Sequence, residues 1–399
     1  MNFACKALAV TVTLAGAVTA AAQVSDDVIR IGFISDMSGV YRDYDGPAGA
    51  EAIRMAIADM GGAINGKKIE LVAADHQNKA DIAAAKARQW FDVERFDMLI
   101  GGVNSGAAIA MAGVARDKRK PYFVVGSGAS SLTNEQCSPY TVMYAYDTVA
   151  MARGTASAVL KSGGKRWFFV TADYAFGHAL EADTSKIIEA RGGKVLGSVK
   201  TPLNASDFSS FMLQAQNSKA QILGLANAGG DTINSIKAAK EFGVTKNMKL
   251  AGLLVFFSDI HSLGLKNTEG MQFTAPWYWD MNDGSRKFAD AFMAKTQRRP
   301  SEIQAADYSA TMNYLKAVEK AGTLDADKVM STLKSTKIDD FFGQGYIRED
   351  GRYVHDMYLM QVKSPAESKG TWDYYKIIKK LPADQIWTTK AESKCALWK

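Results

Sequence analysis

The sequence predicts an α/β protein of two lobes, each built around a doubly wound parallel sheet. Short apolar runs alternate with segments whose apolar residues recur at helical spacing, a pattern typical of parallel sheets covered by helices. The chain has 399 residues, which is too long for one ordinary core. The alternation starts afresh after residues 140–147, so we expect a lobe boundary near Asp147.

The first half of the chain supplies the elements of one lobe. Gly, Ser or Pro residues separate the periodic segments and set their limits. In order, we expect a strand at 28–36, a helix at 48–60, a strand at 68–74, a helix at 80–91, a strand at 98–100, a helix that opens at 104–106 and closes before Pro121, and a strand at 122–125.

Residues 96–132 are the most informative part of this lobe. Two apolar runs each end in a loop of small and hydroxyl residues, GGVNSG after the first and GSGASS after the second. Because a helix joins these runs, the two loops should lie side by side at the carboxyl ends of parallel strands. Such loops present backbone N–H groups and hydroxyls to a small, often anionic ligand, but both could also be simple tight turns.

The second half repeats this pattern and then departs from it. The repeat predicts helices at 151–161, 180–190, 208–216 and 232–242 and strands at 167–170, 194–199, 222–226 and 250–257, with a loop at 171–177. Beyond Met271 the alternation weakens, and we expect an extended segment at 271–279, helices at 285–297 and 302–320, and a β hairpin of 354–362 with 372–378. These late pieces must be shared between the two lobes.

The first 22 residues have the layout of a secretory signal peptide. Lys6 precedes an apolar run at 7–18, and three alanines at 20–22 supply a cleavage site. The run is too short for a permanent membrane anchor, and no later stretch reaches about 18 consecutive apolar residues. We therefore expect an exported protein without a membrane span.

Loss of the signal peptide leaves two cysteines, Cys137 and Cys395, and lowers the formal charge from +6 to +5 because Lys6 is removed. An even number of cysteines in an oxidising compartment suggests one disulfide between the C-terminal tail and the loop after residues 126–131, although two unrelated thiols are the alternative. The remaining basic excess is spread along the chain without a run of five like charges, which argues against nucleic-acid binding.

Reactive motifs are missing from the sequence. The four histidines are far apart and lack the spacing of a metal site. Residues 61–67 resemble a phosphate loop, but Lys68 stands where Ser or Thr must hold magnesium, and the segment precedes a strand instead of following one. Ser127 lacks a nucleophile-elbow context, and the GSG around it lacks the third glycine of a dinucleotide fingerprint. We therefore expect a binding protein that is not an enzyme and needs no metal or cofactor.

Loops at the strand ends of the two lobes would face each other if the lobes close like jaws. Several of them carry aromatic residues, which favour an apolar or aromatic ligand, although aromatic side chains also fill cores. The candidate ligand-binding residues are Asn104, Ser105, Ser127, Gly128, Ala129 and Tyr146 on the first side, and Tyr174, Phe176, Asn227, Phe256 and Phe257 on the other.

The order and spacing of several segments resemble the leucine/isoleucine/valine-binding family of periplasmic solute receptors of ABC importers. The segments are VIRIGFISDMSGVY, GGVNSG, VVGSGASSLT, ADYAFG and the passage from TEGM to TAPWYW, so the resemblance covers nearly the whole mature chain. It implies two lobes joined by three crossings, near Asp147, Pro276 and Tyr353. The division is then 1–22 signal peptide, 24–146 plus 277–352 lobe 1, 147–276 plus 353–390 lobe 2, and 391–399 tail. A periplasmic monomer that serves an inner-membrane permease is also implied.

The resemblance further implies that Ser105, Ser127 and Ala129 hold a ligand carboxylate. Family members that bind amino acids also present an acidic residue from lobe 2 to the ligand's ammonium, but the corresponding region here reads LLVFF, with Asp259 only after it. Because an unpaired ammonium in an apolar pocket is costly, we expect an aromatic or short-chain organic acid, with a branched-chain amino acid as the alternative. Two other functions stay open: a periplasmic sensor subunit for a membrane signalling protein and, less favoured, an enzyme.

Overall fold

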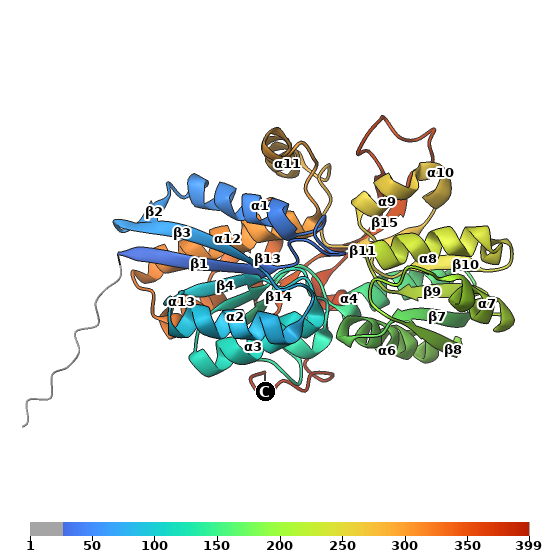
Figure 1. Cartoon of the computed structure of the whole chain (residues 1–399), viewed down its shortest axis with the longest axis horizontal. Coiled ribbons are helices and arrows are strands. Elements are labelled where there is room, and N and C mark those ends of the chain that lie inside the picture. Colours follow the sequence, from blue (N-terminus) through green and yellow to red (C-terminus); the bar gives the residue numbers. More distant parts are fainter. Residues whose placement is uncertain (1–26, 399) are drawn as a thin grey trace, which may run out of the picture.

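The structure, a computed structural model, describes residues 27–398. Two lobes lie side by side, and each has its own parallel sheet, as the sequence predicts (Figure 1). The predicted signal peptide at 1–22 lies outside the described residues. In the part that the structure describes, no helix is long and apolar enough to cross a membrane.

Lobe 1 contains a six-stranded sheet in the order β2-β3-β1-β4-β5-β6. All its neighbouring strands are parallel except the short β2, which pairs antiparallel with β3. The strands are β1 (Val28–Ser35), β2 (Ala63–Ile64), β3 (Lys67–Asp75), β4 (Met98–Gly101), β5 (Tyr122–Val124) and β6 (Thr141–Met143). The strand order changes direction at β1: β3 lies on one side of it and β4 on the other. The loops after β1 and β4 therefore meet at the carboxyl edge of the sheet, where α/β proteins bind ligands.

Helices cover both faces of this sheet. Apolar residues of β1 alternate between the faces: Phe33 packs in the core beneath α1 (Gly46–Asp59) and α12 (Glu302–Ala321), whereas Ile34 packs with α2 (Ala80–Asp92) and α3 (Ser105–Lys118). Two further helices of the late part of the chain are α11 (Asp283–Thr296) and α13 (Ala326–Ser335). A small antiparallel sheet of β12 (Lys337–Asp339), β13 (Gln344–Ile347) and β14 (Tyr353–His355) follows them.

Lobe 2 contains a four-stranded parallel sheet in the order β10-β9-β7-β8. Its strands are β7 (Arg166–Ala172), β8 (Lys194–Thr201), β9 (Ile222–Ala226) and β10 (Lys249–Gly252), and its helices are α6 (Ala175–Ala190), α7 (Ser209–Asn217), α8 (Gly230–Glu241), α9 (Phe257–Leu263) and α10 (Leu265–Thr268). A further antiparallel sheet joins β11 (Gln272–Ala275), β15 (Met357–Val362) and β16 (Tyr375–Leu381), which confirms the expected late hairpin. The residue limits given above for the lobes stay a prediction.

Among the predicted boundaries in lobe 2 that differ from the structure, two have a clear local cause. The strand expected at 250–257 ends at Gly252, and Phe257 already begins α9, because Asp259 accepts a hydrogen bond from the Phe256 N–H and caps that helix. The loop expected at 171–177 shrinks to Asp173 and Tyr174. Gly177 permits this short connection, since a Cβ there would lie 2.0 Å from the Ala172 carbonyl oxygen.

The first connection between the lobes leads into a helical segment with a π-helical turn. Asp147 caps α4 (Thr148–Met151) by accepting the Ala150 N–H at 2.8 Å, and the π-helical turn Ala152–Ala156 leads into α5 (Ser157–Lys161). The expected helix at 151–161 therefore starts one turn earlier. Arg352 and Asp147 form a fully buried ion pair, with 3.9 Å between Arg352 Nε and Asp147 Oδ2, where two connecting segments run together.

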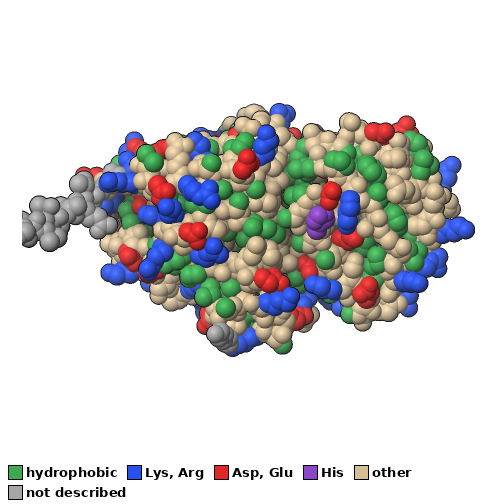
Figure 2. Space-filling view, turned by 60° about the horizontal axis from the view of Figure 1, so that its bottom comes forward, with side chains coloured by type: hydrophobic (Ala, Val, Ile, Leu, Met, Phe, Trp, Pro, Cys, Tyr) green, Lys and Arg blue, Asp and Glu red, His purple; other side chains and the backbone are tan. Residues whose placement is uncertain are grey.

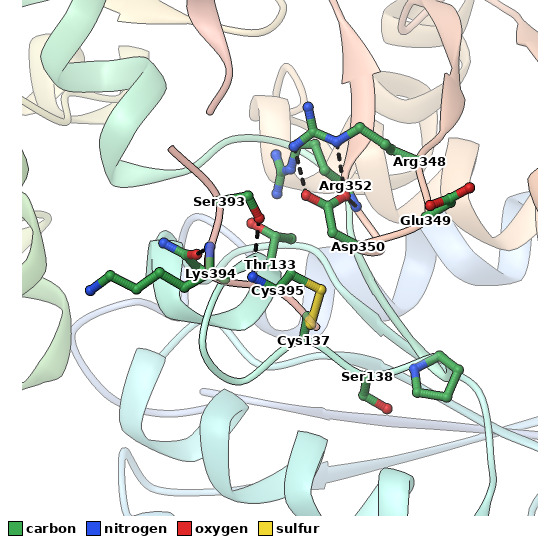
Figure 3. The surroundings of a disulfide bond; sticks show 12 residues. Thr133, Cys137, Ser138, Arg348, Glu349, Asp350, Arg352, Ser393, Lys394 and Cys395 are labelled. Carbon is green, nitrogen blue, oxygen red and sulfur yellow. Dashed lines mark hydrogen bonds and ion pairs between the residues drawn. A yellow bond between two sulfur atoms is a disulfide. The ribbon is translucent and has the colours of Figure 1, made fainter. Parts of the chain in front are cut away.

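The C-terminal segment crosses the junction between the lobes and is tied to lobe 1. After α14 (Ala383–Ile386), Trp387 donates its indole N–H to the His355 carbonyl, and Glu392 pairs with Arg153 at 2.6 Å. Figure 3 shows the disulfide between Cys137 and Cys395, the pairing predicted from the sequence. The tail thus connects the helical segment after the first crossing to the loop before β6.

Loss of this disulfide is expected to lower the free energy of unfolding by about 2–4 kcal/mol, because the bond closes a loop between residues 258 positions apart. The measurement is urea unfolding of the Cys137→Ser/Cys395→Ser double variant beside the native protein. Dithiothreitol should destabilise the native protein by a similar amount and leave the double variant unchanged. Equal midpoints for the two proteins would mean that tail packing, rather than the covalent bond, holds this segment.

Candidate functional site

A small cavity lies between the lobes, at the carboxyl ends of both parallel sheets. Its volume is about 10 Å³, so the side chains of the wall nearly fill it in this arrangement and a ligand has to part the lobes to enter. Its wall is formed by Tyr41, Tyr44, Val103, Gly126 and Tyr146 on the lobe 1 side and by Tyr174, Phe176, Ala228, Leu254 and Phe256 on the lobe 2 side. The side chains in this wall carry no charge, and six of the ten residues are aromatic.

The two Gly/Ser loops of lobe 1 come together beside this wall. Ser105 and Ser127, both buried, are joined by a hydrogen bond of 2.9 Å between their hydroxyls, and each follows a wall residue closely in sequence. Ser105 begins α3, whose first-turn N–H groups have no acceptor within the helix. A carboxylate placed here would meet hydroxyls, backbone N–H groups and the positive end of a helix dipole.

The other predicted lobe 1 residues have structural contacts of their own. Asn104 caps α3 by accepting the Ala107 N–H at 3.1 Å through its side chain. Gly128 packs against Phe176 of lobe 2, and its carbonyl accepts the Thr148 N–H at 2.8 Å. Ala129 is buried in the core beneath α3, while Tyr146 lines the cavity and donates its hydroxyl to the Gly126 carbonyl at 2.8 Å.

Three of the five predicted lobe 2 residues, Tyr174, Phe176 and Phe256, lie in the cavity wall. Asn227 is instead fully buried, and its amide is occupied by Thr232 and Ser235 of α8 at 2.8 and 3.0 Å. Phe257 packs in the lobe 2 core with its ring edge against Trp372. The structure therefore places Asn227 and Phe257 outside the wall.

Sequence reasoning missed the loop after β1, which contributes Tyr41 and Tyr44 to the wall. Tyr41 shares a hydrogen bond of 2.7 Å with Tyr174 across the cleft, and Tyr44 donates its hydroxyl to Asp259 at 2.5 Å. The position of this loop could have identified it as part of the site, because it follows the carboxyl end of β1 and lies beside the loop after β4. Val103, Gly126, Ala228 and Leu254 were also missed, since small and aliphatic residues at strand ends carry no chemical signal.

Asp259 follows the LLVFF segment of lobe 2 and is the acidic residue nearest to the expected position of a partner for a ligand ammonium. Its carboxylate is fully buried, accepts hydrogen bonds from Tyr44 Oη and the Phe256 N–H, and is not part of the cavity wall. Burial raises its pKa to about 7, while the bonds from Tyr44 and Phe256 oppose that rise. In this conformation Asp259 joins the lobes rather than facing a ligand.

Direct contacts between the lobes surround the cavity. Besides the Tyr41–Tyr174 and Tyr44–Asp259 bonds, Ser130 of the second Gly/Ser loop donates to Asp183 of α6 at 2.8 Å. Gly229, with φ of +65°, lies so near Tyr44 that a Cβ would be 3.0 Å from its ring. The lobes are therefore in a closed arrangement.

A larger hollow of about 710 Å³ lies on the surface of lobe 1. It opens to solvent, and both positive and negative side chains line it, among them Lys334, Arg348, Asp327 and Glu349. It also lies away from the strand ends that face lobe 2. The uncharged, aromatic-lined cavity between the lobes is therefore the better candidate for a small-molecule site.

Figure 2 shows positive and negative side chains interspersed on the visible face, without a large area of one sign. This distribution agrees with the absence of charge runs in the sequence and gives no footprint for nucleic acid on that face. In the described part of the chain, no three His, Cys, Asp or Glu residues are grouped so that they could hold a metal ion.

Comparisons with known proteins give a consistent result. The model of the family described as "Periplasmic binding protein" matches residues 28–371. A periplasmic binding protein from Burkholderia mallei is 62% identical, with a TM-score of 0.93 over 94% of this chain and 100% of that one. A branched-chain amino acid ABC transporter periplasmic ligand-binding protein from Burkholderia xenovorans is 37% identical, with a TM-score of 0.83 over 93% and 100%. A solute-binding protein of an ABC transporter from Rhodopseudomonas palustris, solved with p-hydroxybenzoic acid, is 25% identical, with a TM-score of 0.80 over 90% and 98%.

Proposed function

Because the chain belongs to the periplasmic binding protein family, we propose that it is the extracytoplasmic solute-binding receptor of an ABC importer and captures a small carboxylate-bearing ligand between its lobes. The observation that carries the proposal is the uncharged, aromatic-lined cavity between the lobes, bordered by the two Gly/Ser loops. Solute-binding proteins named for ABC transporters share the fold over nearly their whole length.

The carboxylate is proposed to bind at Ser105, Ser127 and the adjoining backbone N–H groups. These groups are buried, so each charge-assisted hydrogen bond to the carboxylate contributes roughly 1.5–3 kcal/mol. The rest of the ligand would lie against Tyr146, Tyr174, Phe176 and Phe256, which present rings or hydroxyls and no charge.

An aromatic or short organic acid is favoured over a branched-chain amino acid. An α-ammonium would be desolvated in this cavity without an acidic side chain in the wall, since Asp259 is occupied by Tyr44. Relatives support both ligand classes: one is named for branched-chain amino acids and another was solved with p-hydroxybenzoic acid. The absence of a charged partner in the wall is the reason to prefer the second class.

The proposed function also includes export to the periplasm and delivery of the ligand to a membrane permease. The family is periplasmic, and we propose that the segment at 1–22 directs export and is removed near Ala22. The receptor would act as a monomer that delivers its ligand to a permease in the inner membrane, and it would carry out no catalysis.

Mass spectrometry of the native protein, followed by a thermal-shift screen, tests this function. We expect a bound acid to be released on denaturation, and benzoate-like acids to raise the unfolding temperature while leucine and valine do not. At a ligand concentration 100 times the Kd, the gain in unfolding free energy is about 2.7 kcal/mol. Stabilisation by leucine or valine with no effect of the aromatic acids would refute the ligand class.

A further inference from the structure

A pair of tyrosine hydroxyls spans the cleft inside the candidate cavity. Tyr41 lies on the loop after β1 in lobe 1, and Tyr174 lies between β7 and α6 in lobe 2. Their hydroxyl oxygens are 2.7 Å apart, and both residues line the cavity. One hydrogen is used in the bond between them, so the pair retains a second hydrogen and free lone pairs for a ligand.

The other hydroxyls in the wall already have protein partners. Tyr44 donates to Asp259 at 2.5 Å, and Tyr146 donates to the Gly126 carbonyl at 2.8 Å. The remaining wall side chains, those of Val103, Phe176, Ala228, Leu254 and Phe256, form no hydrogen bonds. Among the described side chains of the wall, Tyr41 and Tyr174 therefore hold the uncommitted donor hydrogen.

The electrostatic surroundings decide which ligand group suits this pair. Asp231 is buried at the start of α8, three residues after the wall residue Ala228. Burial raises the pKa of both Tyr41 and Tyr174, and the negative charge of Asp231 adds to that rise. Its Oδ2 accepts the Asn204 N–H at 3.1 Å. A second carboxylate on the ligand would be repelled here, whereas a hydrogen-bond donor would be favoured.

A neutral donor fits better than a cation. Asp231 is not part of the cavity wall, so a ligand ammonium would contact only the neutral tyrosine oxygens and would lose much of its hydration energy. A ligand hydroxyl loses much less hydration energy than an ammonium when it moves from water into the cavity. It can donate its hydrogen to one tyrosine oxygen and accept the second hydrogen of the tyrosine pair.

We propose that Tyr41 and Tyr174 together recognise a hydroxyl substituent, so that the receptor selects a hydroxylated aromatic acid over the unsubstituted acid and over an aromatic dicarboxylate. The inference rests on the proposed function, because it assumes that an aromatic acid occupies this cavity. It assigns the selectivity to one residue from each lobe, so the preferred ligand also joins the lobes.

Isothermal titration of the whole mature protein tests this assignment. The probes are benzoate, the three monohydroxybenzoates and terephthalate. We expect one monohydroxybenzoate to bind at least about tenfold tighter than benzoate, and terephthalate to bind more weakly than benzoate. In the Tyr41→Phe/Tyr174→Phe variant the preference for the hydroxylated acid over benzoate should fall below about threefold, while loss of the bond between the lobes weakens the binding of both acids.

Tyr146→Phe is the matched control, since it removes a hydroxyl of the same wall that is bonded to Gly126. This variant should change the affinities of benzoate and the hydroxylated acid by a similar factor and keep their ratio. Equal native affinities for benzoate and every hydroxylated acid, tighter binding of terephthalate, or an unchanged ratio in the double variant would each overturn the inference and leave the proposed function standing. Absence of binding by every aromatic acid would instead overturn the proposed ligand class, and the inference with it.

Discussion

Replacing Gly128 by valine is expected to weaken ligand binding by about 10- to 100-fold while the lobes themselves stay folded. A Cβ at this position would lie 2.8 Å from Cε2 of Phe176 and 3.1 Å from Cε of Met151. Phe176 belongs to lobe 2 and lines the cavity, so it must either move into the ligand's space or hold the lobes apart. Overpacking of this kind costs about 1–3 kcal/mol, and each 1.4 kcal/mol corresponds to a tenfold change in affinity.

The measurement is calorimetric titration with the tightest-binding acid from the screen, together with small-angle scattering to compare the compactness of native protein and variant. Gly113→Val provides the control, because Gly113 lies in the same lobe on α3 and a Cβ there meets no atom within 4 Å. The control should keep its affinity. If Gly128→Val also bound normally, the closed packing of Gly128 on Phe176 would not belong to the binding state.

The order of elements could be predicted because the strands here carry a strong local signal. The runs at β1, β4, β5 and β9 are almost wholly buried, and each ends in Gly, Ser or Asn or is followed by one within two residues, so composition marks both the strand and its carboxyl end. The parallel pairing then places the loops after β1, β4 and β5 on one edge. That reasoning correctly brought Ser105 and Ser127 together.

Side-chain partners were harder to predict, since they depend on residues outside the local pattern. Asn227 follows a buried strand and looked like a ligand group, but Thr232 and Ser235, one and two turns into α8, take up its amide. Tyr44 looked like an ordinary loop residue, and its role depends on Asp259, which lies 215 positions later on the opposite lobe. Hydrophobic periodicity carries no information on such contacts.

The closed arrangement depends on a small set of polar contacts between otherwise separate lobes. Loop 37–45 contributes two of them, through Tyr41 and Tyr44, and is itself anchored to α12. Ser301 donates to the Tyr44 carbonyl, and Gln304 donates to the carbonyls of Asp43 and Asp45 at 3.3 and 3.4 Å. The position of this loop on α12 therefore sets the positions of Tyr41 and Tyr44, two of the five lobe 1 residues in the cavity wall.

A buried pair of carboxyl groups lies at the end of this loop. Asp45 and Asp307 are both fully buried, and a Cβ at Gly49 would lie 2.2 Å from Oδ1 of Asp45 and 2.8 Å from Oδ2 of Asp307, so the two groups converge on one point. Ser35 donates its hydroxyl to the other oxygen of Asp45. Burial raises the pKa of both carboxyls, and the charge of Asp45 raises the pKa of Asp307 further, so the folded pair retains a proton well above pH 4.

The pair should make the folded protein less stable as the pH rises. In the unfolded chain both carboxyls ionise near their ordinary pKa of about 4, whereas the folded pair still holds a proton, so the folded state binds more protons from about pH 4 up to the folded-state pKa of the pair. The free energy of unfolding then falls by up to about 1.4 kcal/mol per pH unit for one retained proton. The loss ends once the pH exceeds the folded-state pKa of the pair.

Asp307→Asn is expected to remove this loss, because an amide can donate a hydrogen bond to ionised Asp45 and no second carboxyl remains to repel it. At pH 8 the variant should be more stable than the native protein by about 2–3 kcal/mol, and the difference should shrink towards pH 5. Burial also raises the pKa of Asp259 to about 7 and that of Glu302 to about 8. These two groups change the unfolding free energy of both proteins with pH in the same way, so their effect cancels in the difference between the proteins.

Urea unfolding from pH 5 to pH 8 measures the effect, with Asp384→Asn, a change at an exposed position in α14, as the control. The control curve should run parallel to that of the native protein. An Asp307→Asn curve that is also parallel to the native one would show that the pair does not hold the extra proton. Because Asp45 ends the loop that carries Tyr41 and Tyr44, a steeper fall of ligand affinity with pH in the native protein than in Asp307→Asn would link the same proton to the cavity.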